Sequence, residues 1–345
     1  MQFIKSTKTA MARYISIALL ILLTACQASD TNKSPSLPNI IFILADDMGY
    51  GDIRALNPDS KITTPHMDRI AHEGIHFTDA HSPSAVCTPT RYGLLTGRYC
   101  FRSRLQSGVL VGHSPSLIEP GKLTVASLLK QSGYATGCIG KWHLGLDFRK
   151  KDSDRPLTAG EDWSIESTDN VDYTSEVHGG PCDHGFDYSF ILPSSLDIQP
   201  YLFISNQQVV EPETEHIEEV REGRGLFWRY GDASKGFDFW QVLPVLTNKA
   251  TDFIKGHHQE NPGQPFFLYF PLTAPHTPWV PADEFKGTSE AGDYGDFVTQ
   301  VDHTVGQVLA LIDSLNSADN TLIMVSSDNG SHWMPDDINR YDHRA

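Results

Sequence analysis

Residues 39–47 read Asn-Ile-Ile-Phe-Ile-Leu-Ala-Asp-Asp, an apolar and β-branched run that ends in two carboxylates. Such a continuous run is typical of a strand buried on both faces, as in a parallel sheet. A second strand is predicted at 321–326, and it leads into Ser-Asp-Asn-Gly at 327–330. Both stretches therefore place oxygen ligands just past the carboxyl end of a buried strand, where open α/β sheets bind their ligands.

The rest of the chain alternates between helix and strand patterns. The expected elements are a helix from Thr64-Pro65 to Gly74, a helix at 124–131, strands at 135–139 and 265–272, and a long helix over 297–315. The stretch 150–222 is rich in Asp, Glu, Ser, Gly and Pro, and it is interpreted as long loops or an insertion that shapes a pocket. The alternation predicts an α/β fold with a mostly parallel central sheet sandwiched by helices.

Composition narrows the functional classes. The chain has 345 residues, 39% of them hydrophobic, which is enough to bury a core, so global disorder is excluded. Its formal net charge of −16 disfavours a nucleic-acid partner, because phosphate binding requires basic patches. An anionic substrate would have to be held by a few placed cations or a metal.

The N-terminal segment is interpreted as a targeting signal. Basic residues precede an apolar run at 15–23 that is too short for a permanent membrane span. Residues 23–26, Leu-Thr-Ala-Cys, resemble a bacterial lipobox, in which the cysteine, here Cys26, becomes the lipidated N-terminus; an ordinary signal peptide with a chance cysteine is the alternative. The expected organisation is a signal peptide over 1–25, a lipidated tether over 26–37 and an incomplete catalytic domain over 38–345. We expect an exported lipoprotein, held by its lipid at the outer membrane or the periplasmic face.

Four oxygen-bearing side chains follow the two strands, namely Asp46, Asp47, Asp328 and Asn329. Carboxylate and amide oxygens suit Ca²⁺ or Mg²⁺. Either pair alone could equally be a solvated turn, since Asp and Asn favour turns. The presence of both pairs after buried strands favours a divalent metal site.

The sharpest local pattern is Cys-Thr-Pro-Thr-Arg at 87–91, followed by Leu-Thr-Gly-Arg at 95–98. Read alone, it could be a structural cysteine before a helix begun by Pro89, with Arg91 as a solvated charge. Three further motifs follow in order: Gly-Lys-Trp-His-Leu-Gly at 140–145, His-Gly-Phe-Asp at 184–187 and Pro-His-Thr-Pro at 275–278. The ordered set resembles the type I, formylglycine-dependent sulfatases, an arylsulfatase-like family of the alkaline-phosphatase-like superfamily.

The resemblance implies a mechanism. In this family the cysteine, here Cys87, is oxidised by a maturation enzyme to formylglycine, whose aldehyde hydrates to a diol. One hydroxyl attacks sulfur, and the other lets the covalent sulfate intermediate collapse by elimination. An unmodified cysteine has no second hydroxyl and cannot complete this cycle.

The resemblance also implies roles for the other motif residues. Asp46, Asp47, Asp328 and Asn329 would hold Ca²⁺ or Mg²⁺, and Asp328 would also be a candidate base for the attacking hydroxyl. Cys87 would have four catalytic partners. Arg91 would stabilise the diol and the metal-site charges, and Lys141 would bridge position 87 and the sulfate. His143 would take a proton when the intermediate collapses, and His276 would protonate the leaving oxygen.

The sequence departs from the family pattern in two places. Thr90 stands where serine is common, although it keeps the hydroxyl. The family's further lysine, in a Lys-Gly-x-x-x-Glu-Gly-Gly-like segment after Asp-Asn-Gly, does not occur before the chain ends at Ala345. The sequence therefore resembles the N-terminal part of a sulfatase without the smaller C-terminal domain, and we expect the 345-residue chain to be poorly stable and nearly inactive.

The leading functional hypothesis is a sulfuric ester hydrolase that cleaves sulfate monoesters of aryl or carbohydrate substrates. One alternative is a phosphodiesterase or phosphonate monoester hydrolase of the same superfamily, some of which also use formylglycine. Another is an inactive lipoprotein that binds sulfated glycans. The expected partners are a sulfated small molecule or glycan, the formylglycine-generating enzyme and a membrane reached through the N-terminal lipid, with no nucleic acid.

Overall fold

The computed structural model describes residues 37–345 apart from 162 and 224. The predicted signal peptide, nearly all of the tether and the predicted lipid site at Cys26 therefore lie outside the described residues. Within the described part, no helix combines the length and the apolar character needed to cross a bilayer.

A seven-stranded sheet organises the region from Pro38 to Ala345. Its strand order is β15 (Thr321–Ser327), β1 (Asn39–Ala45), β14 (Phe266–Pro271), β2 (Ala135–Lys141), β7 (Tyr188–Leu192), β8 (Ile204–Ser205) and β9 (Gln208–Val209). The first five strands run parallel, and β8 and β9 add antiparallel pairs at one edge. The predicted mostly parallel sheet is confirmed.

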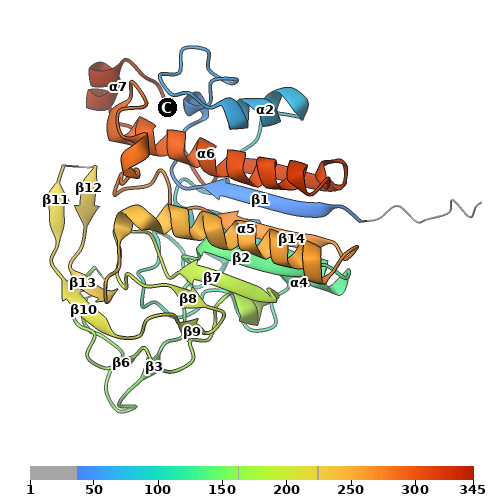
Figure 1. Ribbon diagram of the computed structural model, residues 1–345. Helices are drawn as coiled ribbons and strands as arrows, with labels where there is room; N and C mark the ends of the chain where they lie inside the picture. The colour runs from blue at the N-terminus through green and yellow to red at the C-terminus, as the bar shows by residue number, and fades with distance from the viewer. Residues whose placement is uncertain (1–36, 162, 224) are drawn as a thin grey trace, which may run out of the picture. The chain divides into compact units, whose positions relative to one another are not determined.

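Helices cover both faces of the sheet. On one face lie α2 (Pro65–Glu73), α5 (Val242–Glu260) and α6 (Gly292–Ser314), and on the other lie α3 (Cys87–Thr96) and α4 (Val125–Gln131). Figure 1 shows α5 and α6 running roughly along the direction of the strands, with α6 above β1 and α5 in front of β14. Alternate residues of β1 serve the two layers: Ile41 and Ile43 join the core under α5 and α6, whereas Leu44 joins the core under α3. The uninterrupted apolar run reflects this two-sided burial.

Several predicted elements are confirmed almost to the residue. Helix α2 starts at Pro65 and is closed by Gly74, α4 follows the N-cap Thr124, and α6 carries the long apolar face. The strand at 321–326 differs from the expectation, because β15 is the edge of the sheet and only half buried. Leu322 is 49% exposed and Met324 36% exposed on its outer face.

The stretch predicted as loops, 150–222, holds more structure than its composition indicates. It contributes β7, β8 and β9 to the main sheet. Small two-stranded sheets extend from it: β3 (Arg149–Lys150) with β6 (Val171–Asp172), β4 (Ala159–Glu161) with β5 (Ser164–Ser167), β10 (Thr214–Ile217) with β13 (Gly231–Ser234), and β11 (Val220–Glu222) with β12 (Leu226–Trp228). Helix α5 was also not predicted.

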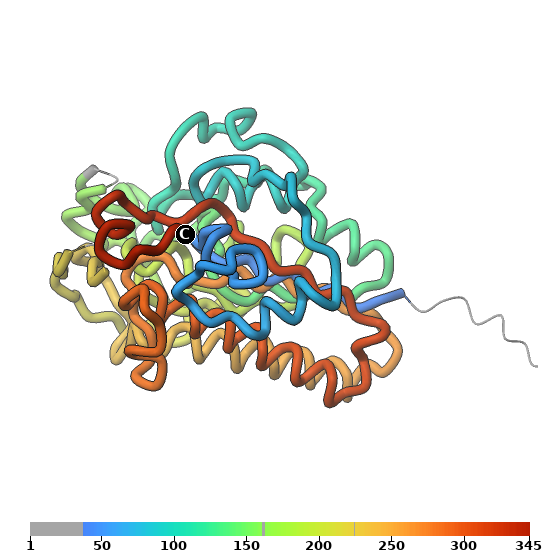
Figure 2. The backbone as a smooth tube through the Cα atoms, turned by 90° about the horizontal axis from the view of Figure 1, so that it is seen from above, coloured from blue at the N-terminus to red at the C-terminus, as the bar shows by residue number. Residues whose placement is uncertain are grey.

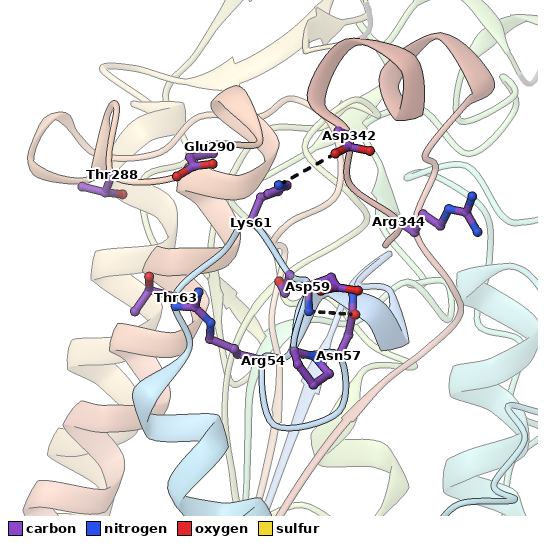
Figure 3. Close-up of a pocket in the computed structure, with 11 residues that line it drawn as sticks. Arg54, Asn57, Asp59, Lys61, Thr63, Thr288, Glu290, Asp342 and Arg344 are labelled. Carbon is purple, nitrogen blue, oxygen red and sulfur yellow. Dashed lines mark hydrogen bonds and ion pairs between the residues drawn. The ribbon is translucent and has the colours of Figure 1, made fainter.

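The C-terminal residues pack against the loop that follows β1 (Figure 2). After α7 (Pro335–Tyr341), the chain buries His343, whose Nε2 lies 2.8 Å from Asp52 Oδ1. A side chain at Gly49 would collide with the backbone of Ala345, so a glycine is required at this close approach. Between the two segments lies a polar cavity of about 660 Å³, bordered by the Lys61–Asp342 ion pair at 3.9 Å (Figure 3).

A buried polar network ties the loop region to the fold. His113 Nε2 lies 2.9 Å from the hydroxyl of Tyr173, which donates in turn to Asp232 Oδ2 at 3.1 Å. Because Tyr173 donates to the carboxylate, His113 Nε2 is the donor to Tyr173. Burial lowers the pKa of His113 to about 4, although Asp232 opposes this shift.

The lowered pKa of His113 predicts that the folded protein loses stability in acid. The unfolded chain binds a proton at His113 near pH 6.5 and the folded chain only near pH 4, so the free energy of unfolding should fall as pH drops through that window. The loss attributable to His113 is about 3 kcal/mol. In His113→Gln, denaturant unfolding between pH 7 and 4 should show a loss smaller by about that amount.

The matched control is His258→Gln on the exposed side of α5. A pH profile of His113→Gln that parallels the wild type would contradict the prediction.

Candidate active site

The predicted site residues meet at the carboxyl edge of the sheet. Strands β15, β1, β14 and β2 are successive neighbours and parallel, so their ends lie together. The residues come from β1 or its end (Asp46, Asp47), α3 (Cys87, Arg91), β2 and the turn after it (Lys141, His143), the loop after β14 (His276) and the end of β15 (Asp328, Asn329).

Two residues of the site have an uncommon backbone conformation. Asp47 and His143 have φ values of 62° and 54°, in the left-handed region that non-glycine residues seldom adopt. The Asp47 N–H donates to Asp328 Oδ1 at 3.1 Å, and the Asp328 N–H donates to the carbonyl of Ala45 at 3.0 Å. These two hydrogen bonds fix the loops that follow β1 and β15 to each other. The positive φ values of Asp47 and His143 are a form of backbone strain that is typical of functional sites.

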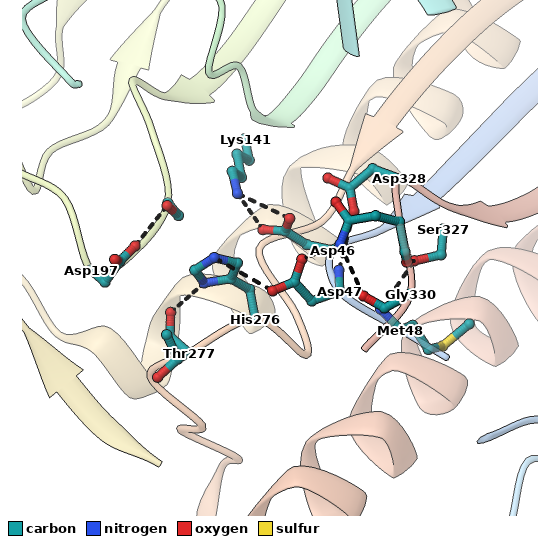
Figure 4. A network of polar contacts seen from close by, with 12 residues as sticks. Asp46, Asp47, Met48, Lys141, Asp197, His276, Thr277, Ser327, Asp328 and Gly330 are labelled. Carbon is teal, nitrogen blue, oxygen red and sulfur yellow. Dashed lines mark hydrogen bonds and ion pairs between the residues drawn. The ribbon is translucent and has the colours of Figure 1, made fainter. Parts of the chain in front are cut away.

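The centre of the site is a fully buried cluster of charges. Lys141 Nζ donates to both oxygens of Asp46, at 2.6 and 2.9 Å (Figure 4). Arg91 Nη2 lies 2.8 Å from Asp328 Oδ2 and 3.2 Å from Asp46 Oδ1, and Arg91 Nη1 donates to the carbonyl of Lys141 at 2.9 Å. All four side chains are inaccessible to solvent. Arg91 is thus a buried, paired cation and not a solvated charge.

Three carboxylates and one amide lie together where they could hold a cation. Ligand oxygens of Asp46, Asp47 and Asp328 lie within 4.8 Å of one another. The Asn329 amide donates to Asp47 Oδ1, while the buried Asn329 Oδ1 has no hydrogen-bond partner among the described residues. Burial and the neighbouring Asp46 raise the pKa of Asp328. Crowded carboxylates beside an unpartnered amide oxygen fit a hard divalent cation.

The thiol of Cys87 is poorly suited to act as a nucleophile. Cys87 is the first residue of α3 and is 7% exposed. Burial raises its pKa to about 11, and the neighbouring Lys141 only partly offsets this. Because the thiolate is the reactive form, the unmodified side chain is nearly inert at neutral pH. Thr88 fixes this end of α3 by donating to the carbonyl of His143 at 3.0 Å.

The pKa values of the two histidines are shifted in opposite directions. His143 Nε2 donates to the Leu110 carbonyl at 2.8 Å, and burial together with Lys141 lowers its pKa well below the usual range. Its buried Nδ1 has no partner among the described residues, so a lone pair is available to accept a proton. For His276, burial disfavours the charge, but Asp47, whose Oδ2 is 3.7 Å away, and Asp46 raise the pKa above its usual value.

These groups border a cavity of about 300 Å³. Its lining includes Cys87, His143 and His276, and also residues that the sequence did not single out: Trp163, Ser195, Asp197, Arg229 and His332. Ser195 and Asp197 follow β7, so recognising that strand would have drawn attention to them.

Other motif residues lie elsewhere or are structural. His184 stacks on Trp142, and Asp187 accepts hydrogen bonds from Thr136. Thr90 donates to the Ser84 carbonyl at 3.0 Å, so the departure from serine retains a useful hydroxyl.

The comparisons with known proteins agree with this geometry. The chain matches the family described as Sulfatase over residues 38–345. It is 34% identical over 346 aligned positions to an N-acetylgalactosamine-6-O-sulfatase of Bacteroides thetaiotaomicron, covering 90% of this chain and 63% of that protein. It is 30% identical to the human N-acetylgalactosamine-6-sulfatase, with 86% and 51% covered.

A solved structure gives the same result. A sulfatase from work on glycosaminoglycan metabolism by Bacteroides thetaiotaomicron superposes with a TM-score of 0.71 at 32% identity, covering 86% of this chain and 63% of that one. The chain thus spans roughly half to two thirds of the length of these relatives. Because the match extends across the whole sheet and every motif at its carboxyl edge, the chain belongs to the sulfatase family, within the alkaline-phosphatase-like superfamily.

Proposed function

We propose that the protein is a sulfuric ester hydrolase that removes sulfate from carbohydrate monoesters, and that residues 38–345 supply its nucleophile, metal ligands and acid–base groups. The observation that carries the proposal is the buried Arg91–Lys141–Asp46–Asp328 cluster beside the start of α3, where Cys87 stands. The relatives named for N-acetylgalactosamine 6-sulfate support a sugar as the alcohol component.

The buried cations suit an anionic ester. Sulfate carries its charge on oxygens that shield sulfur, and Lys141 and Arg91 supply fixed positive charge on side chains that are fully buried. A bound Ca²⁺ or Mg²⁺ would be held by Asp46, Asp47, Asp328 and Asn329, and it would add Lewis acidity at the same edge. Formylglycine at position 87 would supply a hydrated aldehyde as the nucleophile in place of the inert thiol.

The histidines divide the proton transfers. His143 Nδ1 is a neutral acceptor, so it can take a proton from the group at position 87. His276 holds its proton more tightly because carboxylates surround it, and it can donate to the oxygen of the departing sugar. Their opposite pKa shifts support His143 as the base and His276 as the acid.

The nucleophile gives the first functional test. In a protein that extends this chain to the length of its relatives, Cys87→Ala should lower p-nitrophenyl sulfate turnover by several orders of magnitude, because the attacking group is removed. The protein should be made in a host with a formylglycine-generating enzyme. Peptide mass should show position 87 lighter than cysteine by about 18 Da, since oxygen replaces sulfur and two hydrogens are lost.

Cys100→Ala, at another buried cysteine, is the matched control. Sulfatase activity near the wild-type level in Cys87→Ala would rule out formylglycine chemistry. Faster turnover of a phosphate diester or a phosphonate monoester than of the sulfate would favour the other hydrolases of the superfamily.

The metal site gives the second test. Ca²⁺ or Mg²⁺ at about 100 times its dissociation constant should stabilise the fold by about 2.7 kcal/mol, measured as an increase in Tm. Asp47→Ala should lose most of this increase, whereas Asp319→Ala, at an exposed position, should keep it. Stoichiometric zinc in the purified protein, without any response to Ca²⁺ or Mg²⁺, would argue against an oxygen-ligated site.

We also propose that the protein is exported and anchored by lipid at Cys26, on the strength of the Leu-Thr-Ala-Cys sequence. Palmitate labelling should disappear in Cys26→Ala and persist in Cys182→Ala. The Cys26→Ala protein should move to the soluble fraction, because stable anchoring needs the acyl chains. Unchanged membrane partition would indicate a different anchor.

A further inference from the structure

We infer that Arg229 and Asp197 form a pair that binds the hydroxyl groups of the sugar ring bearing the sulfate. In this inference the Trp163 indole packs against the same ring. This inference rests on the proposed function and deepens it, because it assigns the recognition of the alcohol component. The three residues come from separate segments, the turn between β4 and β5, the loop after β7 and the end of β12.

The pair is held rigidly. Arg229 Nη1 donates to Asp197 Oδ2 at 2.6 Å and to the Asp197 carbonyl at 2.9 Å, and the Arg229 N–H reaches the same carbonyl at 3.3 Å. Ser195 donates to the other carboxylate oxygen at 2.7 Å, and the Tyr201 hydroxyl donates to the Arg229 carbonyl at 2.7 Å. Preorganised side chains bind with a smaller loss of conformational entropy.

The pair faces the reacting groups. Asp197 and Arg229 line the same cavity as Cys87, His143 and His276. Asp197 and His276 interact electrostatically, and Figure 4 shows them on the side of the site away from Asp328. His276 is the proposed donor to the departing oxygen, so a ring attached to that oxygen can lie in the part of the same cavity that Asp197 lines.

The pair retains capacity to bind. The side chain of Arg229 is 27% exposed and that of Asp197 11% exposed. Within the described residues, the guanidinium uses only Nη1 in hydrogen bonds, so its other donors can reach a ligand. The guanidinium also lies 5.1 Å from the centre of the Trp163 ring, and Trp163 is 50% exposed.

The chemistry of these groups selects a polyol. A hydroxyl both donates and accepts, so the carboxylate and the guanidinium can engage adjacent hydroxyls of one ring. An exposed indole face offers an apolar surface to the C–H face of a pyranose. Because Asp197 neutralises Arg229, the pair favours uncharged hydroxyls over a second sulfate or a carboxylate on the same ring.

The experiment compares three primary sulfates: N-acetylgalactosamine 6-sulfate, cyclohexylmethyl sulfate, whose ring has no hydroxyls, and p-nitrophenyl sulfate. The main measurement is Kd, by calorimetry with Ca²⁺ present, on the 345-residue protein with Cys87 converted, because we expect this chain to be nearly inactive. KM and kcat are added wherever turnover can be measured. In the wild type the sugar should bind about 10- to 100-fold more tightly than cyclohexylmethyl sulfate. Asp197→Asn and Arg229→Lys should each reduce that preference by about tenfold or more, mainly through KM and Kd.

The controls are Asp169→Asn and Arg155→Lys, which alter an ion pair of similar length, 2.7 Å, on the exposed surface. They should leave the preference unchanged. An equal preference in the wild type and the Asp197 and Arg229 variants would overturn the inference while sulfate hydrolysis stood. Failure of the wild type to bind any of the three sulfates would instead overturn the proposed function. Wild-type binding of cyclohexylmethyl sulfate as tight as that of the sugar would refute the pair's role without any variant.

Discussion

The ion pairs of Arg91 hold the site together. This side chain leaves α3 on one face of the sheet and reaches carboxylates at the ends of two neighbouring strands, Asp46 after β1 and Asp328 after β15. A buried guanidinium must be paired, because an unpaired charge in the interior is very costly. The helix that presents Cys87 is therefore fixed relative to the proposed metal ligands by electrostatics as well as by packing.

The balance of charges around Arg91 determines which ligands the site can accept. The central cluster sets Lys141 and Arg91 against three carboxylates, and Asn329 adds an amide oxygen that has no hydrogen-bond partner in the part of the chain that the structure describes. Attraction between these charges is strong only because water is excluded, and removing one member would leave its partners exposed to the same low dielectric. The arrangement thus favours a cation from solution and an anionic substrate together over either one alone.

Much of this could be read from the sequence, because each strand that builds the site ends in its own functional residue. The run at 39–45 and the carboxylates after it predicted β1 and its ligands, and the ordered motifs predicted Cys87 and its partners. The half-exposed character of β15 could not be predicted, since residue types do not reveal which strand lies at an edge. Asp197 and Arg229 also escaped prediction, because short strands in a polar region bring them to the cavity through tertiary contacts alone.

The burial of Cys87 has a consequence for the life history of the protein. Cys87 is only 7% exposed and is the first residue of a helix that the Arg91 ion pairs hold in place. In the folded protein another enzyme therefore cannot bind around this side chain. On the proposed chemistry, the oxidation of Cys87 must then come before the fold closes, while this segment is still extended. Since Asp328 lies 237 positions beyond Arg91, their ion pair forms only after that long stretch of chain has been made, and synthesis itself leaves an interval in which the segment can be modified.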